Sequence, residues 1–292
     1  MDAWSGQILD GRYRLLGRLG SGGAGSVYRA MPLAGGAPVA VKLLEARVGQ
    51  KEDLRERFER EARALNGLSH PHLIKLLDFG IAGTTPYIVT ELLNGTPLDR
   101  LIAKRPLPPH NAFELALGVV AGLAHAHAHG VLHRDVKPSN VFVAALAGGV
   151  LHAKLLDFGL ARFVDHARWG KHETLTEEGS VIGTPTYMPP EQGFGGRADA
   201  RSDVYSVGCV LYELLAGRPP FVRESRTSLI RAHAMDPIEL PSLVRPGLWV
   251  HPDLQAILLK TLAKEPAARY EDARVLLRAL QELPEPVAEL VG

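Results

Sequence analysis

The sequence contains one cysteine, no long apolar run and almost no net charge. A single cysteine, Cys209, excludes a disulfide framework and a metal site of several thiolates, and its apolar neighbours favour a small buried side chain. No segment reaches the roughly 18 apolar residues of a membrane-spanning helix, so we expect no membrane segment in this chain. A formal net charge of +1 gives no bulk electrostatic reason to bind nucleic acid. The first residues lack a basic-then-apolar secretion signal, which favours a cytoplasmic protein.

The length of the chain, 292 residues, predicts one large domain or two coupled lobes. The first part has strand patterns and one charged, helix-forming stretch. We expect strands over 13–19, 27–31, 39–44, 70–80 and 86–91 and a helix over 51–66. Further on we expect helices over 109–129, 201–216, 227–235, 252–264 and 271–282, and short strands over 141–143 and 151–156. No element is predicted after residue 283.

Four glycines lie within six residues in Gly20-Ser-Gly22-Gly-Ala-Gly25. Glycine lets backbone N–H groups approach a phosphate closely. The residues that follow have a strand pattern, whereas the glycine loop of a dinucleotide-binding fold opens a helix. The motif therefore predicts a loop between two antiparallel strands. On its own it is equally consistent with a flexible surface hairpin.

Lys42 ends a strand-like run, where a lysine is usually solvated unless it has a partner. The helix expected over 51–66 offers one. Its apolar residues, among them Leu54 and Phe58, share one face, and Glu61 falls on that same face. Because a carboxylate on a buried face needs a cation, we expect an ion pair between Lys42 and Glu61.

The loop Val131-Leu-His-Arg-Asp-Val-Lys-Pro-Ser-Asn-Val141 places an acid, two cations and an amide between apolar residues. Folding tends to bury such a segment, and polar side chains grouped there are costly unless something uses them. The polar groups in question are Arg134, Asp135, Lys137 and Asn140. A second acid, Asp157, follows further along the chain.

The hexapeptide Lys-Leu-Leu-Asp-Phe-Gly occurs twice, at 75–80 and at 154–159. The first copy follows no asparagine-bearing loop and continues into a turn and another strand. We therefore predict that Asp78 is structural and that Asp157 takes part in the chemistry.

Three histidines, His125, His127 and His129, alternate at the end of the helix expected over 109–129. On a helix only the first and third share a face, and no third metal ligand is evident. The pattern favours polar histidines at a helix end over a metal site.

Together these groups suit phosphoryl transfer, which needs charge neutralisation and positioning more than covalent chemistry. Magnesium prefers hard oxygen ligands such as carboxylate and amide oxygens. A further carboxylate must orient or accept the proton of the acceptor hydroxyl. The motifs follow one another in order along residues 12–282, together with Pro190-Glu191 and Asp203–Gly208. In this order they resemble a protein kinase of the eukaryotic-like serine/threonine type, similar to bacterial members.

The resemblance implies an α+β fold of two lobes. The N-lobe would be an antiparallel five-stranded sheet with one main helix, and the C-lobe would be mainly helical. We expect an N-terminal extension over 1–11, a catalytic domain over 12–282 and a tail over 283–292. Within that domain the N-lobe would cover 12–90, the hinge 91–97 and the C-lobe 98–282.

The resemblance also implies that the cofactors are ATP and Mg²⁺, with Mn²⁺ as an alternative metal. Asp135 would be the catalytic base, and Lys137 would contact the γ-phosphate. Asn140 and Asp157 would bind the metal ion. Lys42 would hold the α- and β-phosphates.

Further residues take implied roles around these groups. Glu61 would pair with the phosphate-binding lysine in the active state. The residues implied to surround ATP are Gly20, Gly22, Gly25, Val27, Ala40, Lys42, Thr90, Glu91, Leu93 and Phe142. Glu191 would pair with Arg269, and Asp203 would brace the catalytic loop.

Lys137 and Thr184 together resemble the serine/threonine rather than the tyrosine branch. Arg134 precedes the catalytic aspartate, and this cation needs an anion, which a phosphorylated activation segment would supply. The leading candidate phosphorylation site is Thr176, and Thr174 and Ser180 are the further candidates. The implied partners are protein substrates and ATP, with a homodimer for autophosphorylation.

Three other interpretations stay open. A pseudokinase would share the fold without the reaction, although the catalytic residues named above are all present. A phosphotransferase for small molecules is disfavoured by Pro190-Glu191 and Arg269, which point to protein substrates. A nucleotide-binding or structural module leaves the clustered polar residues unexplained. These motifs do not encode the protein substrate or the oligomeric state.

Overall fold

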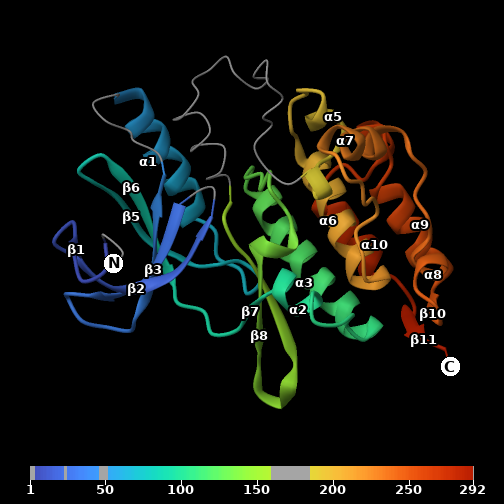
Figure 1. Cartoon of the computed structure of the whole chain (residues 1–292), viewed down its shortest axis with the longest axis horizontal. Coiled ribbons are helices and arrows are strands. Elements are labelled where there is room, and N and C mark those ends of the chain that lie inside the picture. The colour runs from blue at the N-terminus through green and yellow to red at the C-terminus, as the bar shows by residue number, and fades with distance from the viewer. Residues whose placement is uncertain (1–3, 23–24, 46–51, 159–184, 292) are drawn as a thin grey trace. The chain divides into compact units, whose positions relative to one another are not determined.

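The computed structural model describes residues 4–22, 25–45, 52–158 and 185–291. The chain forms two compact units. The N-terminal unit comprises Met1–Asn94 with Asp157–Glu173, and the C-terminal unit comprises Gly95–Leu156 with Thr174–Gly292. Strands dominate the first unit and helices the second (Figure 1), so the expected α+β division is confirmed.

A six-stranded antiparallel sheet forms the N-terminal unit, in the order β1-β2-β3-β4-β6-β5 (Figure 1). Its strands are β1 (Ile8–Leu9), β2 (Tyr13–Gly22), β3 (Gly25–Pro32), β4 (Val39–Leu44), β5 (Leu76–Ala82) and β6 (Thr85–Glu91). The five strands expected are one too few, because β1 lies in the stretch expected to be an extension. Leu9 of β1 pairs with Tyr13 and is buried. Two residues are too short to show the alternation that marks a strand in sequence.

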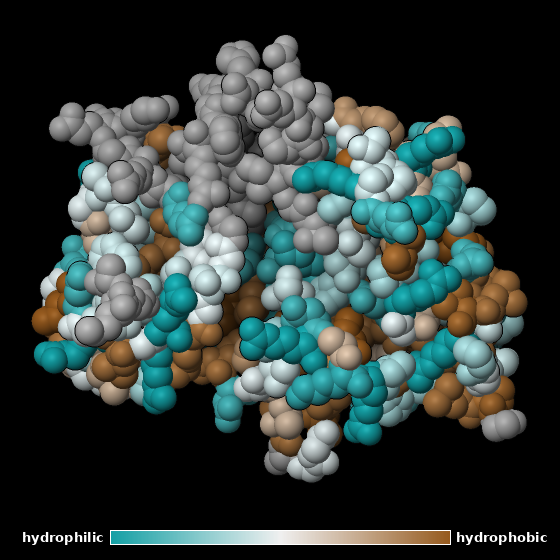
Figure 2. Space-filling view, in the orientation of Figure 1, coloured by the Kyte–Doolittle hydropathy of each residue, from teal (hydrophilic) through white to brown (hydrophobic). Residues whose placement is uncertain are grey.

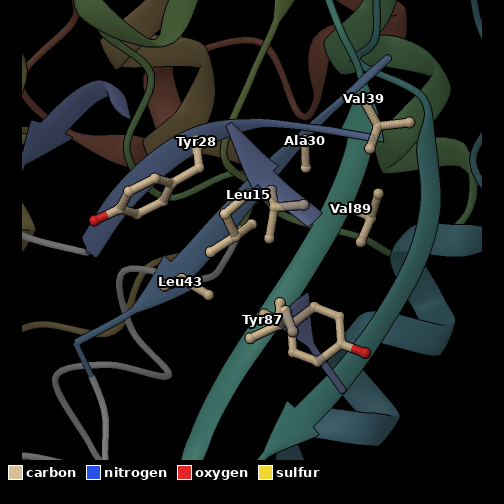
Figure 3. Packing of buried hydrophobic residues seen from close by; sticks show 9 residues of the cluster. Leu15, Tyr28, Ala30, Val39, Leu43, Tyr87 and Val89 are labelled. Atoms are coloured by element: carbon tan, nitrogen blue, oxygen red, sulfur yellow. The ribbon is translucent and has the colours of Figure 1, made fainter. Parts of the chain in front are cut away.

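Side chains alternate across this sheet, so its two faces have separate cores. On one face Tyr28, Val41 and Val89 lie opposite one another on β3, β4 and β6. Leu15 and Tyr87 complete the centre of this buried cluster (Figure 3). The alternation of apolar residues that predicted these strands therefore marks the side chains that are buried on this face.

Helix α1 (Glu52–Asn66) supplies the core of the other face. Phe58 is fully buried there against Leu44 and Ile88, and its ring meets Phe79 edge-on at 6.1 Å between centroids. Burial of one such side chain stabilises the unit by about 2 kcal/mol. The apolar stripe that predicted this helix is the surface by which it packs.

The C-terminal unit is built around α6 (Ala200–Ala216), which is buried almost all round. It begins at a capping box formed by Asp199 and Ser202 and ends at Gly217, whose φ of 79° is left-handed. A Cβ on Gly208 would lie 2.6 Å from Thr261 of a neighbouring helix, so glycine permits the close approach. In the described part of this unit, the other helices are α2 (Leu98–Ile102), α3 (Pro109–Ala128), α5 (Pro190–Gly193), α7 (Arg226–Met235), α8 (Pro241–Val244), α9 (Pro252–Thr261) and α10 (Ala273–Gln281).

Short elements complete this unit. The 3-10 turns are η1 (Pro138–Asn140), η2 (Ala147–Gly149), η3 (Pro185–Tyr187) and η4 (Pro266–Ala268). A three-stranded sheet joins β7 (Thr96–Pro97), β8 (Val141–Ala145) and β9 (Leu151–Leu155). The loop of interest, 131–140, therefore connects the end of α3 to the start of β8.

The tail expected to be without structure contains a strand. Here β11 (Ala288–Leu290) pairs with β10 (Leu248–Val250), and Val287 and Ala288 are buried. The prediction is wrong because prolines dominate the local pattern, whereas the pairing partner is distant in sequence.

None of the described helices is long and apolar enough to cross a membrane. On the face shown in Figure 2, hydrophilic residues are interspersed with apolar ones. Cys209 is buried in α6, as its apolar neighbours predict, and burial raises the pKa of its thiol. This cysteine therefore stays protonated and packs as a small apolar side chain.

Candidate active site

Asp203 fixes the turn at the start of the catalytic loop. Its Oδ2 accepts a hydrogen bond from the backbone N–H of His133 and its Oδ1 accepts one from that of Arg134, both at 2.7 Å. The Asp203 side chain is 1% exposed. Arg134 has a left-handed φ of 66°, an unfavourable conformation that persists only when its surroundings hold it. The brace implied by the resemblance is present and holds this strained turn.

Asp135 is held by the two other polar groups of the same loop. Lys137 Nζ lies 2.8 Å from Asp135 Oδ2, and Asn140 Nδ2 donates to that oxygen at 2.9 Å. Asn140 Nδ2 also donates to the backbone carbonyl of Asp135 at 2.8 Å. In the described part of the chain, Asp135 Oδ1 has no hydrogen-bond partner. One carboxylate oxygen is thus fixed and the other is available.

Asp157 stands in a second strained turn, with a left-handed φ of 60°. It directly follows Leu156, whose N–H donates to the Asn140 carbonyl at 2.8 Å and whose carbonyl lies 2.6 Å from His133 Nε2. The Asp157 carboxylate itself lies 2.6 Å from Lys42 Nζ. Hydrogen bonds on both sides of Leu156 therefore hold the chain where this acid begins its turn.

The expected ion pair between Lys42 and Glu61 is not formed by the described residues. Lys42 is buried and pairs with Asp157, while Glu61 accepts a hydrogen bond from Arg57 Nε at 3.1 Å. The expectation overlooked Arg57, which lies four residues before Glu61 on the same helix. The i, i+4 spacing of these two charges is a signal that sequence can show.

The glycine-rich stretch joins β2 to β3, as the strand pattern after it predicts. Gly20 lies opposite Val27, and Gly22 lies opposite Gly25. Gly25 has a φ of 146°, and a Cβ there would lie 2.0 Å from the Leu43 carbonyl oxygen. Packing against β4 therefore requires this glycine whether or not a phosphate binds.

Neighbouring strands bring four of the expected nucleotide-binding residues together. Val27 of β3 lies opposite Lys42 of β4, and Ala40 of β4 lies opposite Thr90 of β6. The adjacent Glu91 exchanges hydrogen bonds with the backbone of the segment before β5. Leu93 is half-buried near the end of the N-terminal unit, and Phe142 is half-buried in β8 of the C-terminal unit.

Glu191 and Arg269 form the two-point ion pair that the resemblance implies. Arg269 Nη1 and Nη2 donate to the two Glu191 oxygens at 3.0 and 2.9 Å. Burial alone would raise the pKa of Glu191, but hydrogen bonds from Arg269 and Ser202 outweigh it and lower that pKa. Arg269 also lies over the ring of Tyr205. The pair joins α5 to the loop before α10.

The candidate phosphorylation sites Thr174, Thr176 and Ser180 lie outside the described residues, and so does Thr184. Their implied partner, Arg134, is described. Its Nε is buried without a hydrogen-bond partner among the described residues.

Asp78 has a structural environment, as predicted. Tyr13 Oη donates to its carboxylate at 2.5 Å, and Arg12 forms an ion pair with it. These contacts tie β5 to the start of β2.

One residue of the site was not predicted. His127, expected to be a polar residue at a helix end, is 2% exposed, and its Nε2 lies 3.0 Å from Asp203 Oδ2. The alternating histidines gave a partial signal, since they place His127 on a different face of α3 from its two neighbours.

A strand-rich unit with a glycine hairpin and a buried lysine, and a helical unit with a braced Asp-Lys-Asn loop, define a protein kinase fold. The protein kinase domain family matches residues 13–279, so the chain belongs to the protein kinase family. It is 38% identical to the serine/threonine-protein kinase Pkn1 of Myxococcus xanthus over 271 residues, which cover 93% of this chain and 38% of Pkn1. It is 40% identical to PknB of Mycobacterium leprae over 271 residues, covering 91% and 42% of the two chains.

Other relatives agree. The chain is 38% identical to the serine/threonine-protein kinase PknL of Mycobacterium tuberculosis over 288 residues, which cover 98% of this chain and 69% of PknL. The kinase domain of Mycobacterium tuberculosis PknI is similar in structure, with a TM-score of 0.71 and 27% identity over 95% of this chain and 98% of that one. The chain thus spans about two fifths of the length of Pkn1 and PknB.

Proposed function

We propose that this chain is a serine/threonine protein kinase that transfers the γ-phosphate of ATP to serine and threonine hydroxyls of protein substrates. The observation that carries the proposal is the braced loop, in which one oxygen of Asp135 has no partner among the described residues. The named activity of the bacterial relatives supports the same conclusion.

Asp135 is proposed to act as the base. Lys137 and Asn140 hold its Oδ2, so Oδ1 is left to accept a hydrogen bond from an acceptor hydroxyl. Lys137, once it contacts a γ-phosphate, would neutralise charge that develops during transfer. In this proposal Asp135 orients the acceptor hydroxyl, and Lys137 neutralises negative charge on the γ-phosphate.

The residues proposed to bind Mg²⁺, or Mn²⁺ in its place, offer suitable donors. Asn140 turns its Nδ2 toward Asp135, which leaves its Oδ1 without a partner among the described residues. Asp157 adds a carboxylate, so both side chains present hard oxygens of the kind these cations prefer. When bound, such an ion would neutralise phosphate charge.

The N-terminal unit is proposed to hold the nucleotide. Lys42 is a buried, cationic side chain that lies opposite Val27, next to the glycine hairpin. It would exchange its contact with Asp157 for the phosphate oxygens. The residues proposed to surround ATP are Gly20, Gly22, Gly25, Val27, Ala40, Thr90, Glu91 and Leu93, with Phe142 from the C-terminal unit.

Regulation is proposed to act through Arg134. Phosphorylation of Thr176, or of Thr174 or Ser180, would supply an anion for this cation and raise activity. Autophosphorylation between two copies of the chain, in the cytoplasm, is the proposed route. Unchanged activity after phosphatase treatment would contradict this part of the proposal.

The central test is Asp135→Asn, which keeps the shape of the side chain and removes its basicity. We expect transfer from labelled ATP to a generic protein substrate to fall by about 10²–10⁴-fold. Asp253→Asn is the control, because Asp253 is an exposed acid of α9 and should leave the rate unchanged. Equal transfer rates in the two variants would contradict the role of Asp135 as the base, and no transfer by the unchanged chain would indicate a binding protein of kinase fold. Transfer to small alcohols but not to protein would favour a small-molecule phosphotransferase.

A further inference from the structure

His127 is a buried histidine between two parts of the C-terminal unit. It lies in the last turn of α3, and its side chain is 2% exposed. Its ring contacts Asp203 of α6 on one side and the first residue of α10, Ala273, on the other. It belongs to none of the groups proposed to touch ATP, metal or substrate.

The two contacts determine where the ring proton lies. The backbone N–H of Ala273 is a donor and lies 3.2 Å from His127 Nδ1, so Nδ1 accepts and carries no proton. The Nε2 atom then carries the proton and donates it to Asp203 Oδ2 at 3.0 Å. The ring is therefore the neutral Nε2–H tautomer, with both nitrogens in use.

Asp203 has several donors to satisfy its buried charge. Oδ2 accepts from His127 and from the His133 N–H, and Oδ1 accepts from the Arg134 N–H. A buried carboxylate is stable only when hydrogen bonds replace its lost hydration. Loss of the His127 donor would leave Asp203 with the two loop amides, and the carboxylate would be free to turn toward other donors or water.

The start of α10 is itself a defined structure. Asp272 caps the helix by accepting from the N–H groups of Arg274 and Val275. The N–H that precedes these two, that of Ala273, donates to His127 instead. One imidazole ring thus connects the N-terminus of α10 to the carboxylate that holds the catalytic turn.

We propose that His127 is a positioning residue that couples the N-terminus of α10 to the catalytic loop through Asp203. The coupling rests on the proposed function, because its consequence for the rate requires that Asp135 be the catalytic base. Movement of α10 would shift the ring, then Asp203, and then the left-handed turn at Arg134 that precedes Asp135.

Two substitutions remove the two hydrogen bonds of the His127 ring one at a time. His127→Asn places an amide oxygen near the position of Nδ1, so the bond from Ala273 can persist while the donor to Asp203 is lost. His127→Gln places an amide N–H near the position of Nε2, so the donor to Asp203 can persist while the acceptor for Ala273 is lost. His129→Asn is the matched control, because His129 is exposed two residues along. Among the described residues, its ring bonds the His125 carbonyl and lies against the His125 ring, both on its own helix.

Rates are measured at a temperature where circular dichroism shows every variant folded, with ATP and Mg²⁺ supplied. For His127→Asn we expect kcat to fall by about tenfold or more while KM for ATP stays within about twofold, as for a residue that acts only on the reacting geometry. His127→Gln and His129→Asn should stay within about threefold of the unchanged chain. A kcat for His127→Asn equal to that of His129→Asn would overturn the proposal.

Hydrogen exchange gives a readout that does not depend on activity. The amides of His133 and Arg134 should exchange faster in His127→Asn, and the amide of Ala273 should exchange faster in His127→Gln. A uniform increase across the C-terminal unit in both variants would mean a loss of packing only, and would count against coupling.

The unchanged chain offers a third test that survives if a variant fails to fold. Nitrogen-15 spectra should show His127 as the neutral Nε2–H tautomer near neutral pH. A ring protonated on Nδ1 would overturn the proposal. If the unchanged chain transfers no phosphate, the proposed function fails, while the exchange and tautomer tests still decide whether His127 links α10 to Asp203.

Discussion

The two copies of Lys-Leu-Leu-Asp-Phe-Gly, at 75–80 and 154–159, differ in backbone, partners and surroundings although their residues are the same. In the first, Asp78 continues along β5 beside a register shift in its pairing with β6. In the second, the strand ends at Leu155 and Asp157 turns into the left-handed region. The first acid binds Tyr13, and the second binds Lys42.

The contrast shows that neighbours, rather than the six residues, choose the structure. The first copy has a hairpin partner in β6, which extends the strand through the acid. In the second, Asn140 holds the N–H of Leu156 and Lys42 attracts the carboxylate. Tertiary contacts of this kind override local propensity.

Substitution of the two aspartates gives the largest expected difference. Asp157→Asn removes the charge proposed to bind the metal ion, and we expect the phosphoryl transfer rate to fall by about 10³-fold. Asp78→Asn should leave that rate within about threefold, since it touches no proposed reacting group. The comparison breaks if both variants lose activity equally in a steady-state assay at saturating ATP.

A methyl group on Gly80 tests the packing that holds the first copy in β5. A Cβ there would lie 2.6 Å from Tyr87 Oη, and that hydroxyl is tied to Asp10 at 2.9 Å. We expect Gly80→Ala to lower the free energy of unfolding by about 1–3 kcal/mol in urea titrations. Gly17→Ala is the control, because open space surrounds its added methyl group. Equal stability of the two variants would show that the ring can move aside.

The smallest effect concerns pH. Burial raises the pKa of Tyr13 to about 12, and the hydrogen bond to Asp78 adds to this. The folded state therefore keeps the phenol proton above its ordinary pKa of about 10. Stability from this group is complete below about pH 10 and is lost as pH rises toward about 12. Tyr13→Phe should show a shallower decline over that interval, and an unchanged slope would contradict the assignment.

The sequence predicted those elements in which burial against a partner produces a regular spacing of apolar residues. The alternation in β3, β4 and β6 predicted both the strands and their buried face. The charged loop around Asp135 was found because polar residues grouped between apolar ones are unusual.

The rest depended on partners that local pattern does not contain. The strand β11 exists through its pairing with β10, and β1 through its pairing with β2. Glu61 was expected to pair with Lys42 because it lies on the apolar face of the helix. It instead binds Arg57, which lies one turn earlier on the same helix. His127 was missed because its two partners come from α6 and α10, distant in sequence.

The close approach of Gly25 to Leu43 affects how glycine variants of this hairpin should be interpreted. Gly20 and Gly22 have open space where a methyl group would stand, whereas Gly25 has backbone there. An alanine at Gly20 or Gly22 therefore tests whether a bound ligand needs to approach the backbone closely at that position. An alanine at Gly25 distorts the sheet first, and any weakening of nucleotide binding would be secondary. Glycine thus occurs in this motif for two different reasons: ligand approach at Gly20 and Gly22, and packing against β4 at Gly25. Mutational scans that average over the three positions would mix effects on ligand affinity with effects on folding.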